Sequence, residues 1–414
     1  SEVKRLPAKE LLKKIGPGFI LAGIQLGPGS LLTSAMLGAR YGYDIMWILL
    51  LVIFMGLTFI LVCYRLSILT GMPTIHAIRH YYGKGIACFV GIVAFLACMC
   101  FNVGNVSGLG AGMQLIFGID WRIGALIVMS GVFLCYFLKG VYGKLEKGIT
   151  AALAFMAIAF LITLIMSGGI DWAAFGKGLI NWNLPEGSLA NVLGFLGSSA
   201  SVLAGMYGTY LGSEKKWHKR DFFNGVMATD AATQVFGTVV ISGIIIAVGA
   251  VVLNPTGATI SKPADLAAML VATLGSFASL VMGIALLAAA FAAIMGNTGR
   301  SAVFLMAGVD KPTGLESKNI KIAAGIIMAT AIIICFIFGG SPIQLLYFSN
   351  VATSIATPVA GLFITLMMWR KDIGADIKGH KALRNCMMIS YVIYAGLMIY
   401  ALSNAIPNFI SSII

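Results

Sequence analysis

Charged residues are scarce in this sequence: they make up 10% of its 414 residues, whereas a soluble domain carries about 25%. Apolar residues make up 59%. A surface this poor in charge excludes a soluble globular protein, because it would aggregate in water. At roughly 20 apolar residues per span, the chain is predicted to be an all-α polytopic membrane protein of about eleven transmembrane helices. We expect these spans near 16–38, 45–69, 87–116, 122–140, 147–168, 190–212, 225–253, 265–299, 319–339, 343–369 and 385–405.

Acidic residues and histidines are especially few, at 15 and four. The acidic residues fall in loops or near span ends, and Asp230, about a turn inside the seventh span, comes nearest to the membrane interior. The sequence has no His/Cys metal cluster, phosphate loop, nucleophile elbow or zinc-protease motif. We therefore expect no enzyme activity and no cofactor.

The net charge of +13 follows the membrane topology. With the amino terminus inside, 24 of the 28 lysines and arginines fall in cytoplasmic segments, Arg65 and Arg300 among them, and only four fall outside: Arg40, Arg122, Lys177 and Lys262. Such a positive-inside bias predicts a multi-pass protein of the inner (plasma) membrane with a cytoplasmic amino terminus. Its basic charge then matches anionic lipid rather than nucleic acid. Residues 1–15 are expected to form a cytoplasmic amphipathic lead-in.

The spans form two similar halves. The first span carries Gly27-Pro28-Gly29-Ser30, and the sixth carries glycines and hydroxyls from Gly197 to Thr209, about 178 residues later. Five spans per half is an odd number, so the second half must enter from the opposite side. We expect a first inverted repeat at 16–168 (spans one to five), a second at 190–370 (spans six to ten), and a cytoplasmic loop with span eleven at 371–414.

The Gly-Pro-Gly sequence in the first span is predicted to open the helix. Pro28 cannot donate a backbone hydrogen bond, and Gly27 and Gly29 each cost about 1 kcal/mol in a helix interior. Open backbone within the bilayer is tolerated only where protein or a water-filled cavity meets it. Paired broken helices in inverted halves indicate a transporter's binding site. The alternative for one span alone is a proline kink that serves packing.

These residues also resemble a known family. Gly16-Pro17-Gly18-Phe19, then Gly27-Pro28-Gly29-Ser30, then the stretch from Gly38 to Trp47 are similar to the start of the Nramp family of divalent-metal transporters, which typically has GPGF followed by DPGN. Looser similarity continues at 284–298 and at Ser349-Asn350-Val351. The resemblance implies a LeuT-like fold of 5+5 inverted repeats, with alternating access around a site between spans one and six.

The departures from the family point to a distant clade similar to the Nramp-related magnesium transporters. The family's metal-binding aspartate falls at Gly27, and its asparagine falls at Ser30. Its span-six methionine falls near Ala204, with Met206 as a second candidate. Its acidic pair linked to proton movement falls at Asn102 and Asn105. Every carboxylate expected of the family's site is thus replaced by a neutral residue.

Two substrate classes fit this neutral pocket. The first is a largely hydrated divalent cation, Mg²⁺ or Mn²⁺, held through its waters by Ser30 and Asn350, because Mg²⁺ dehydrates reluctantly. The alternative is a small organic solute such as an amino acid or organic acid, whose carboxylate suits the backbone amides at a half-helix start. Without intramembrane carboxylates in spans one and three, transport is expected not to be coupled to protons. Candidate substrate-binding residues are Gln25, Gly27, Gly29, Ser30, Ala204, Met206, Tyr207, Thr209 and Asn350, with Asn102 and Asn105 as former proton-path positions.

Some of these candidates have a second interpretation. Gln25 fits a cavity wall and a hydrogen bond to a neighbouring helix equally well. Tyr207 and Thr209 fit both the pocket and helix-to-helix hydrogen bonding.

Overall fold

The computed structural model describes residues 5–7, 9–11, 17–137, 141–214, 216–338, 342–374, 377 and 379–413, all of them helical or in connections. Within these residues, eight helical stretches are long and apolar enough to cross a membrane, and two shorter apolar helices accompany them at Trp121–Cys135 and Ala154–Met166. The broken pair at the start of the chain adds an eleventh span. The expected all-helical polytopic architecture is confirmed.

The first half contains α2 (Pro17–Gln25), α3 (Pro28–Tyr41), α4 (Trp47–Thr70), α6 (Lys84–Phe117), α7 (Trp121–Phe137) and α8 (Val141–Met166). The second contains α10 (Leu189–Ser199), α11 (Val202–Glu214), α13 (Val226–Val248), α16 (Ala278–Gly308), α17 (Lys318–Phe338) and α18 (Pro342–Met368), followed by α19 (His380–Ile413). Short helices join them: α5 (Thr74–Tyr82), α9 (Trp172–Ile180), α12 (Lys219–Phe223), α14 (Pro263–Ala267) and α15 (Val271–Leu274), with π or 3₁₀ turns at Gly249–Leu253, Asn254–Thr256, Ala268–Leu270 and Gly275–Phe277.

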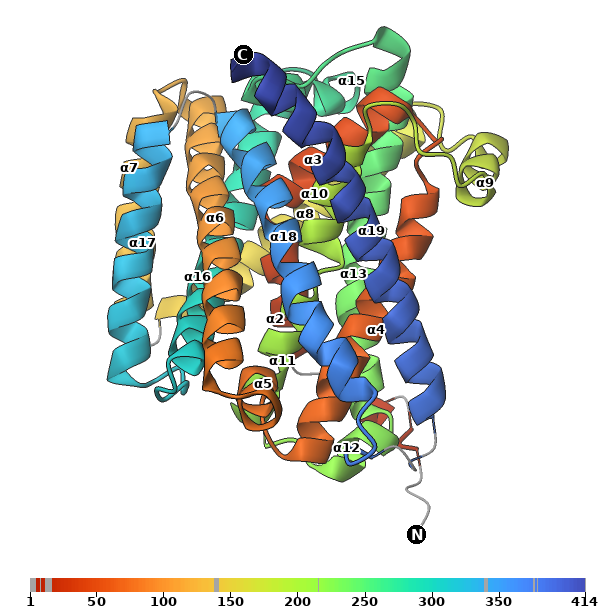
Figure 1. The fold of residues 1–414 in the computed structure, drawn as a ribbon. Coiled ribbons are helices and arrows are strands. Elements are labelled where there is room, and N and C mark those ends of the chain that lie inside the picture. Colours follow the sequence, from red (N-terminus) through yellow and green to blue (C-terminus); the bar gives the residue numbers. More distant parts are fainter. Residues whose placement is uncertain are drawn as a thin grey trace.

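The broken helices lie at the centre of the bundle. Figure 1 shows α2, α3, α10 and α11 surrounded by the longer helices, with α6, α7, α16 and α17 forming one flank and α4, α13 and α19 the other. The short helices α5 and α12 lie at the end of the bundle where the amino terminus is, and α9 and α15 lie at the opposite end. The first half packs on the second chiefly through α6, which contacts α16 and α18.

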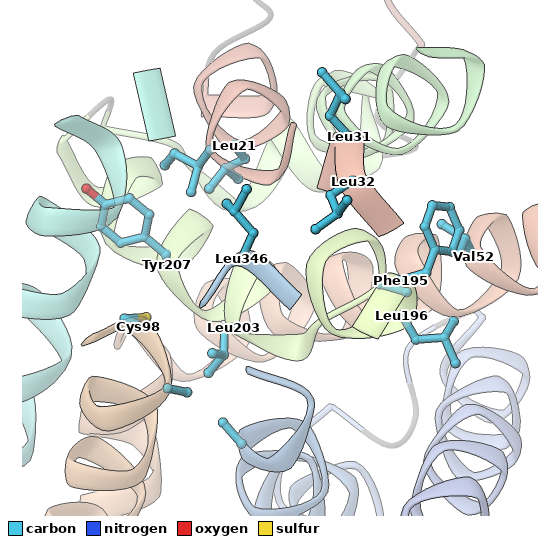
Figure 2. Packing of buried hydrophobic residues seen from close by; sticks show 14 of the residues in the cluster. Leu21, Leu31, Leu32, Val52, Cys98, Phe195, Leu196, Leu203, Tyr207 and Leu346 are labelled. Carbon is cyan, nitrogen blue, oxygen red and sulfur yellow. The ribbon is translucent and has the colours of Figure 1, made fainter. Parts of the chain in front are cut away.

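Apolar side chains from both halves fill the space around the broken helices. Figure 2 shows Leu21 of α2, Leu32 of α3, Leu203 of α11 and Leu346 of α18 gathered in one region, and all four are fully or almost fully buried. Many large apolar side chains on α7, α8, α17 and α19 remain exposed at the rim. A bundle with a packed interior and an apolar outer face is the arrangement that lipid requires.

One predicted span differs from the structure. The eighth span, expected at 265–299, has an irregular entry of short turns, and its regular helix α16 runs from Ala278 to Gly308. Arg300 therefore lies inside a helix, about 12 Å from its carboxyl end at 1.5 Å per residue, and it is buried. The predicted span end at residue 299 was wrong as a helix end, because the apolar run ends at Met295 while the helix continues through polar residues to Gly308.

Candidate functional site

The first span is broken where the sequence predicted. Helix α2 ends at Gln25 and α3 begins at Pro28, with Gly27 between them in extended conformation at φ −66° and ψ 172°. The Ser30 and Leu31 amides both donate to the Gly27 carbonyl, at 3.0 and 3.2 Å. Because Pro28 has no amide hydrogen, the chain cannot continue the α2 ladder through this point. Residues 27 to 30 are all buried.

Helix α6 lies directly against this break. A Cβ atom placed on Gly27 would lie 3.1 Å from Asn105 Oδ1 and 3.3 Å from Phe101 Cζ, so these two side chains face the opened backbone. A Cβ on Gly108 would lie 2.4 Å from Pro28 Cγ. Only glycine at position 108 leaves room for the Pro28 ring, which explains why α6 has a glycine there.

The sixth span is broken at the matching place. Helix α10 ends at Ser199 and α11 begins at Val202, with Ala200 at φ −134° and ψ 39°. The Ser201 hydroxyl accepts from the Leu203 amide at 3.2 Å and lies 3.0 Å from Thr357 Oγ1 of α18. Helix α10 packs against both α3 and α18, and α11 packs against α2. The two breaks and α18 therefore enclose one region.

Several polar atoms in this region are buried and lack a hydrogen-bond partner among the described residues. They are Ser30 Oγ on α3, Ser199 Oγ on α10 and Asn105 Nδ2 on α6. Each of these side chains is 1% exposed. An unsatisfied buried polar group costs about 1–3 kcal/mol, so such groups in one region indicate a place for water or a ligand.

A buried arginine on α16, Arg300, belongs to a layer of hydrogen-bonded polar side chains between α6 and α16. Arg300 Nε donates to Asn297 Oδ1 at 2.9 Å, and Asn297 Nδ2 in turn donates to Asn102 Oδ1 at 2.9 Å. Asn102 Nδ2 donates to Thr298 Oγ1 at 3.1 Å. The Arg300 guanidinium also lies 5.9 Å from the centre of the Phe101 ring. Within the part of the chain that the structure describes, no ion pair includes Arg300.

Other predicted site residues lie at helix contacts. Gln25 Oε1 accepts from Gln234 Nε2 at 3.1 Å and from Thr238 Oγ1 at 3.4 Å, which ties the end of α2 to α13. The Thr209 hydroxyl accepts from the Thr74 amide at 3.1 Å. Tyr207 packs edge to face on Phe304 at 6.2 Å.

The remaining predicted site residues are Ala204 and Met206, Asn350, and the pair Asn102 and Asn105. Ala204 and Met206 are fully buried in the first two turns of α11, directly after the break. The side chain of Asn350 lies outside the described residues. Of the two positions predicted to be former proton-path positions, Asn105 places its Oδ1 near Gly27, whereas the Nδ2 and the Oδ1 of Asn102 both bond to α16.

Helix α13 carries a buried acidic side chain, Asp230, one turn before Gln234. Asp230 is fully buried and accepts a hydrogen bond from Tyr64 Oη at 2.9 Å. Tyr64 also lines a cavity of about 160 Å³ together with Thr209, Trp217 and Lys219.

Sequence reasoning missed Arg300 and Asn297 as parts of this layer. The available signal was the polar sequence Asn297-Thr298-Gly299-Arg300-Ser301 directly after an apolar run, since ionisable residues within spans mark functional positions by default. The predicted eighth span ended at residue 299, so Arg300 was not counted as a residue of that span. Among the described residues, no group of three or more His, Cys, Asp or Glu side chains could hold a metal ion.

Comparison with known proteins decides the family. The model of the Nramp family, described as natural resistance-associated macrophage protein-like, matches residues 18–404. The chain belongs to the Nramp family. This membership bears out the expectation that the chain is not an enzyme.

Curated relatives of this Nramp chain match over part of their length. The divalent metal cation transporter MntH of Yersinia pestis is 30% identical over 199 residues, which is 47% of this chain and 48% of that protein. MntH of Staphylococcus saprophyticus is 30% identical over 155 residues, 37% of this chain and 35% of that protein. The matched region thus spans about half the length of these relatives or less.

Solved structures confirm the LeuT-like fold. The Eremococcus coleocola manganese transporter superposes with a TM-score of 0.76 at 18% identity, covering 99% of this chain and 91% of that one. MhsT, solved with L-phenylalanine, gives 0.60 at 16% identity, covering 92% and 98%. Mhp1, a nucleobase-cation-symport-1 family transporter, gives 0.58 at 14% identity, covering 94% and 93%.

Proposed function

We propose that this Nramp chain is a secondary transporter that carries a divalent metal cation through a site between the breaks of α2/α3 and α10/α11. The observation that carries the proposal is the pair of broken spans packed together, with buried polar atoms of Ser30, Ser199 and Asn105 left unsatisfied around them. Broken helices at matching places in the two halves are the usual location of a transporter's substrate. The MntH relatives are divalent metal cation transporters, which supports a divalent metal as the substrate.

The cation is carried with most of its water, and Mg²⁺ or Mn²⁺ fits best. A bare dication must be paired when it is buried, and the described residues around the breaks offer hydroxyls, amides and backbone carbonyls instead of carboxylates. Because Mg²⁺ dehydrates reluctantly and usually keeps several waters, neutral oxygen groups suit it as partners of its first water shell. Ser30 and Asn350 are the residues that we assign to hold those waters.

Transport is not coupled to protons in this proposal. The positions of the family's acidic pair are Asn102 and Asn105, and neither amide titrates. The membrane potential then supplies the driving force, at about 2.3 kcal/mol per elementary charge for each 100 mV. With the amino terminus on the cytoplasmic side, as the distribution of lysine and arginine favours, a negative interior draws the cation inward.

Uptake into proteoliposomes tests the proposal. Purified protein is reconstituted and an inside-negative potential is imposed. Uptake of Mg²⁺ and Mn²⁺ is followed with an internal metal-sensitive dye, and the internal pH is followed in parallel with a pH dye. We expect saturable, potential-dependent metal uptake without a change in internal pH. If liposomes that contain folded protein take up no metal, a divalent cation is excluded as the substrate. Metal-dependent acidification of the interior would instead show proton coupling.

A small organic solute is the second candidate. The observation that favours it is Arg300, whose buried positive charge has no carboxylate partner among the described residues. Uptake of labelled amino acids and organic acids in the same liposomes separates the two candidates.

A further inference from the structure

A groove runs along one flank of the bundle, between α17 and the paired helices α6 and α16. It has a volume of about 660 Å³. The residues that line it on α17 share one helix face, because they are spaced three and four apart: Ile322, Ala323, Ile326 and Ile327. The other side is formed by α6 and α16, chiefly through Phe95, Leu96, Met99, Leu305 and Met306. Figure 1 shows α17 at the edge of the bundle, so the groove lies on the outer surface, which faces lipid.

The two ends of the groove differ in chemistry. Lys311 and Asn319 line one end. The rest of the lining is apolar except for Thr330, whose hydroxyl donates to the Ile326 carbonyl of its own helix at 2.7 Å. From Asn319 to Ile334 the groove follows α17 for about 22 Å at 1.5 Å per residue. That length exceeds half of the hydrocarbon core, which is about 30 Å thick, so the groove can hold a lipid chain through its whole leaflet.

The polar end carries positive charge that no acidic residue neutralises. The connection between α16 and α17 contains two acidic residues, and both already have a basic partner. Asp310 pairs with Arg79 of α5 at 3.5 Å, and Glu316 pairs with Lys321 at 2.7 Å. Lys311 is exposed and belongs to no ion pair within the described ranges. An anion is therefore the complementary partner at the mouth of the groove.

A second lysine adds to this charge. Lys318, the first residue of α17, is exposed and likewise lacks an ion pair among the residues that the structure describes. Figure 1 shows the connection between α16 and α17 at the end of the bundle where the amino terminus lies. The distribution of lysine and arginine favours the cytoplasmic side for this end. Lipids of the cytoplasmic leaflet are partly anionic and attract basic residues near the surface.

We propose that the groove binds an anionic phospholipid, with its phosphate at Lys311 and an acyl chain along α17. A cationic end followed by a long apolar wall matches the charged head and apolar tail of one such molecule. A second copy of the chain fits less well. In a two-fold contact the same concave surface would face itself, and the groove would stay empty. This inference goes beyond the proposed function, since it does not depend on which solute is carried.

Counting lipids on the purified protein tests the inference. Delipidated protein in detergent is mixed with phosphatidylglycerol, which is anionic, or with phosphatidylcholine of the same acyl chains, which is zwitterionic. Native mass spectrometry then gives the apparent Kd of the first bound lipid. We expect phosphatidylglycerol to bind at least about fivefold more tightly, because one basic residue near an anionic lipid is worth about a factor of five.

Two pairs of variants locate the lipid. Lys311→Gln should weaken phosphatidylglycerol about fivefold and leave phosphatidylcholine unchanged. Its control is Lys381→Gln, at an exposed lysine near the start of α19, and we expect wild-type binding there. Ala323→Phe fills the groove and should weaken both lipids. Its control is Ala329→Phe, because Ala329 is exposed on the same helix but does not line the groove, and we expect no change.

A cross-linking experiment on the wild-type protein keeps the test decisive if the variants fail to fold. Phosphatidylglycerol with a photoactivatable group on one acyl chain should label α17 between Ile322 and Ile334 and α6 near Phe95. Labelling spread evenly over α7, α17 and α19 would overturn the inference. Equal Kd values for the two lipids would overturn it as well, as would wild-type lipid binding by Ala323→Phe. A dimer that Ala323→Phe abolishes, with no lipid bound, would show that a second copy covers the groove instead.

Discussion

Tyr64 donates a hydrogen bond to the buried carboxylate of Asp230 at 2.9 Å, which joins α4 to α13 inside the bundle. Tyr64 also packs edge to face on Trp217 at 5.1 Å, and a Cβ on Gly208 would lie 2.6 Å from its ring. The contact thus joins spans two, six and seven.

Replacing Tyr64 by phenylalanine tests the importance of this contact. The ring packing is kept, but the buried carboxylate loses a donor, so Tyr64→Phe should lower the free energy of unfolding by about 1–3 kcal/mol. Chemical unfolding in detergent measures the change. Adding Asp230→Asn should recover part of the loss, because the amide needs less stabilisation than a carboxylate. A Tyr64→Phe variant as stable as the wild type would show that other contacts already satisfy Asp230.

The close approach of α6 to the first break gives a second prediction. A Cβ on Gly108 would meet Pro28 Cγ at 2.4 Å, so Gly108→Ala must push α3 away from α6. We expect a marked loss of stability or of substrate affinity. Gly131→Ala on α7 is the control, because nothing lies within 4 Å of its Cβ position, and we expect it to be neutral or slightly stabilising. Equal behaviour of the two variants would mean that the bundle relaxes around Gly108 without consequence.

A histidine outside the spans gives a prediction for pH. His76 on α5 lies 3.2 Å from Tyr210 Oη through Nδ1. Burial lowers the pKa of His76; the Asp310 carboxylate opposes this effect and Arg79 adds to it. The folded state therefore binds this proton less readily than the unfolded state, so stability is lost as pH falls below about 6.5, the ordinary histidine value.

Thermal unfolding at pH 7.5 and pH 5.5 checks this sign. Acidification should destabilise the wild type more than His76→Gln, which cannot take up the proton. His80→Gln, on the same short helix, is the comparison. If acidification affects the wild type and His76→Gln equally, His76 is not buried as neutral imidazole.

The positions of the helix breaks could be predicted from the sequence, and the directions of the side chains could not. Gly27, Pro28 and Gly29 reveal a break because their backbone properties do not depend on neighbours. The rotation of α11 about its axis decides whether Thr209 faces the break or Thr74. A helix that is buried on every side has no periodic pattern of apolar and polar residues, so the sequence does not reveal this rotation. Arg300 was not predicted as a site residue for a different reason. The end of an apolar run is a poor guide to the end of a helix that is buried in protein.

Ser30 and Ser34 provide the most direct test of the claim that the first break holds substrate. Both hydroxyls are buried on α3, but Ser34 Oγ donates to the Ser30 carbonyl at 2.8 Å, whereas Ser30 Oγ has no partner among the described residues. The measurement is the KM of Mn²⁺ uptake in proteoliposomes, together with the unfolding midpoint of the substrate-free protein. For Ser30→Ala we predict a KM about fivefold higher, the equivalent of about one lost hydrogen bond, with unchanged or slightly higher stability, because the substitution removes an unsatisfied polar atom. Ser34→Ala should leave KM unchanged. A Ser30→Ala variant that loses stability but transports with the wild-type KM would contradict the account.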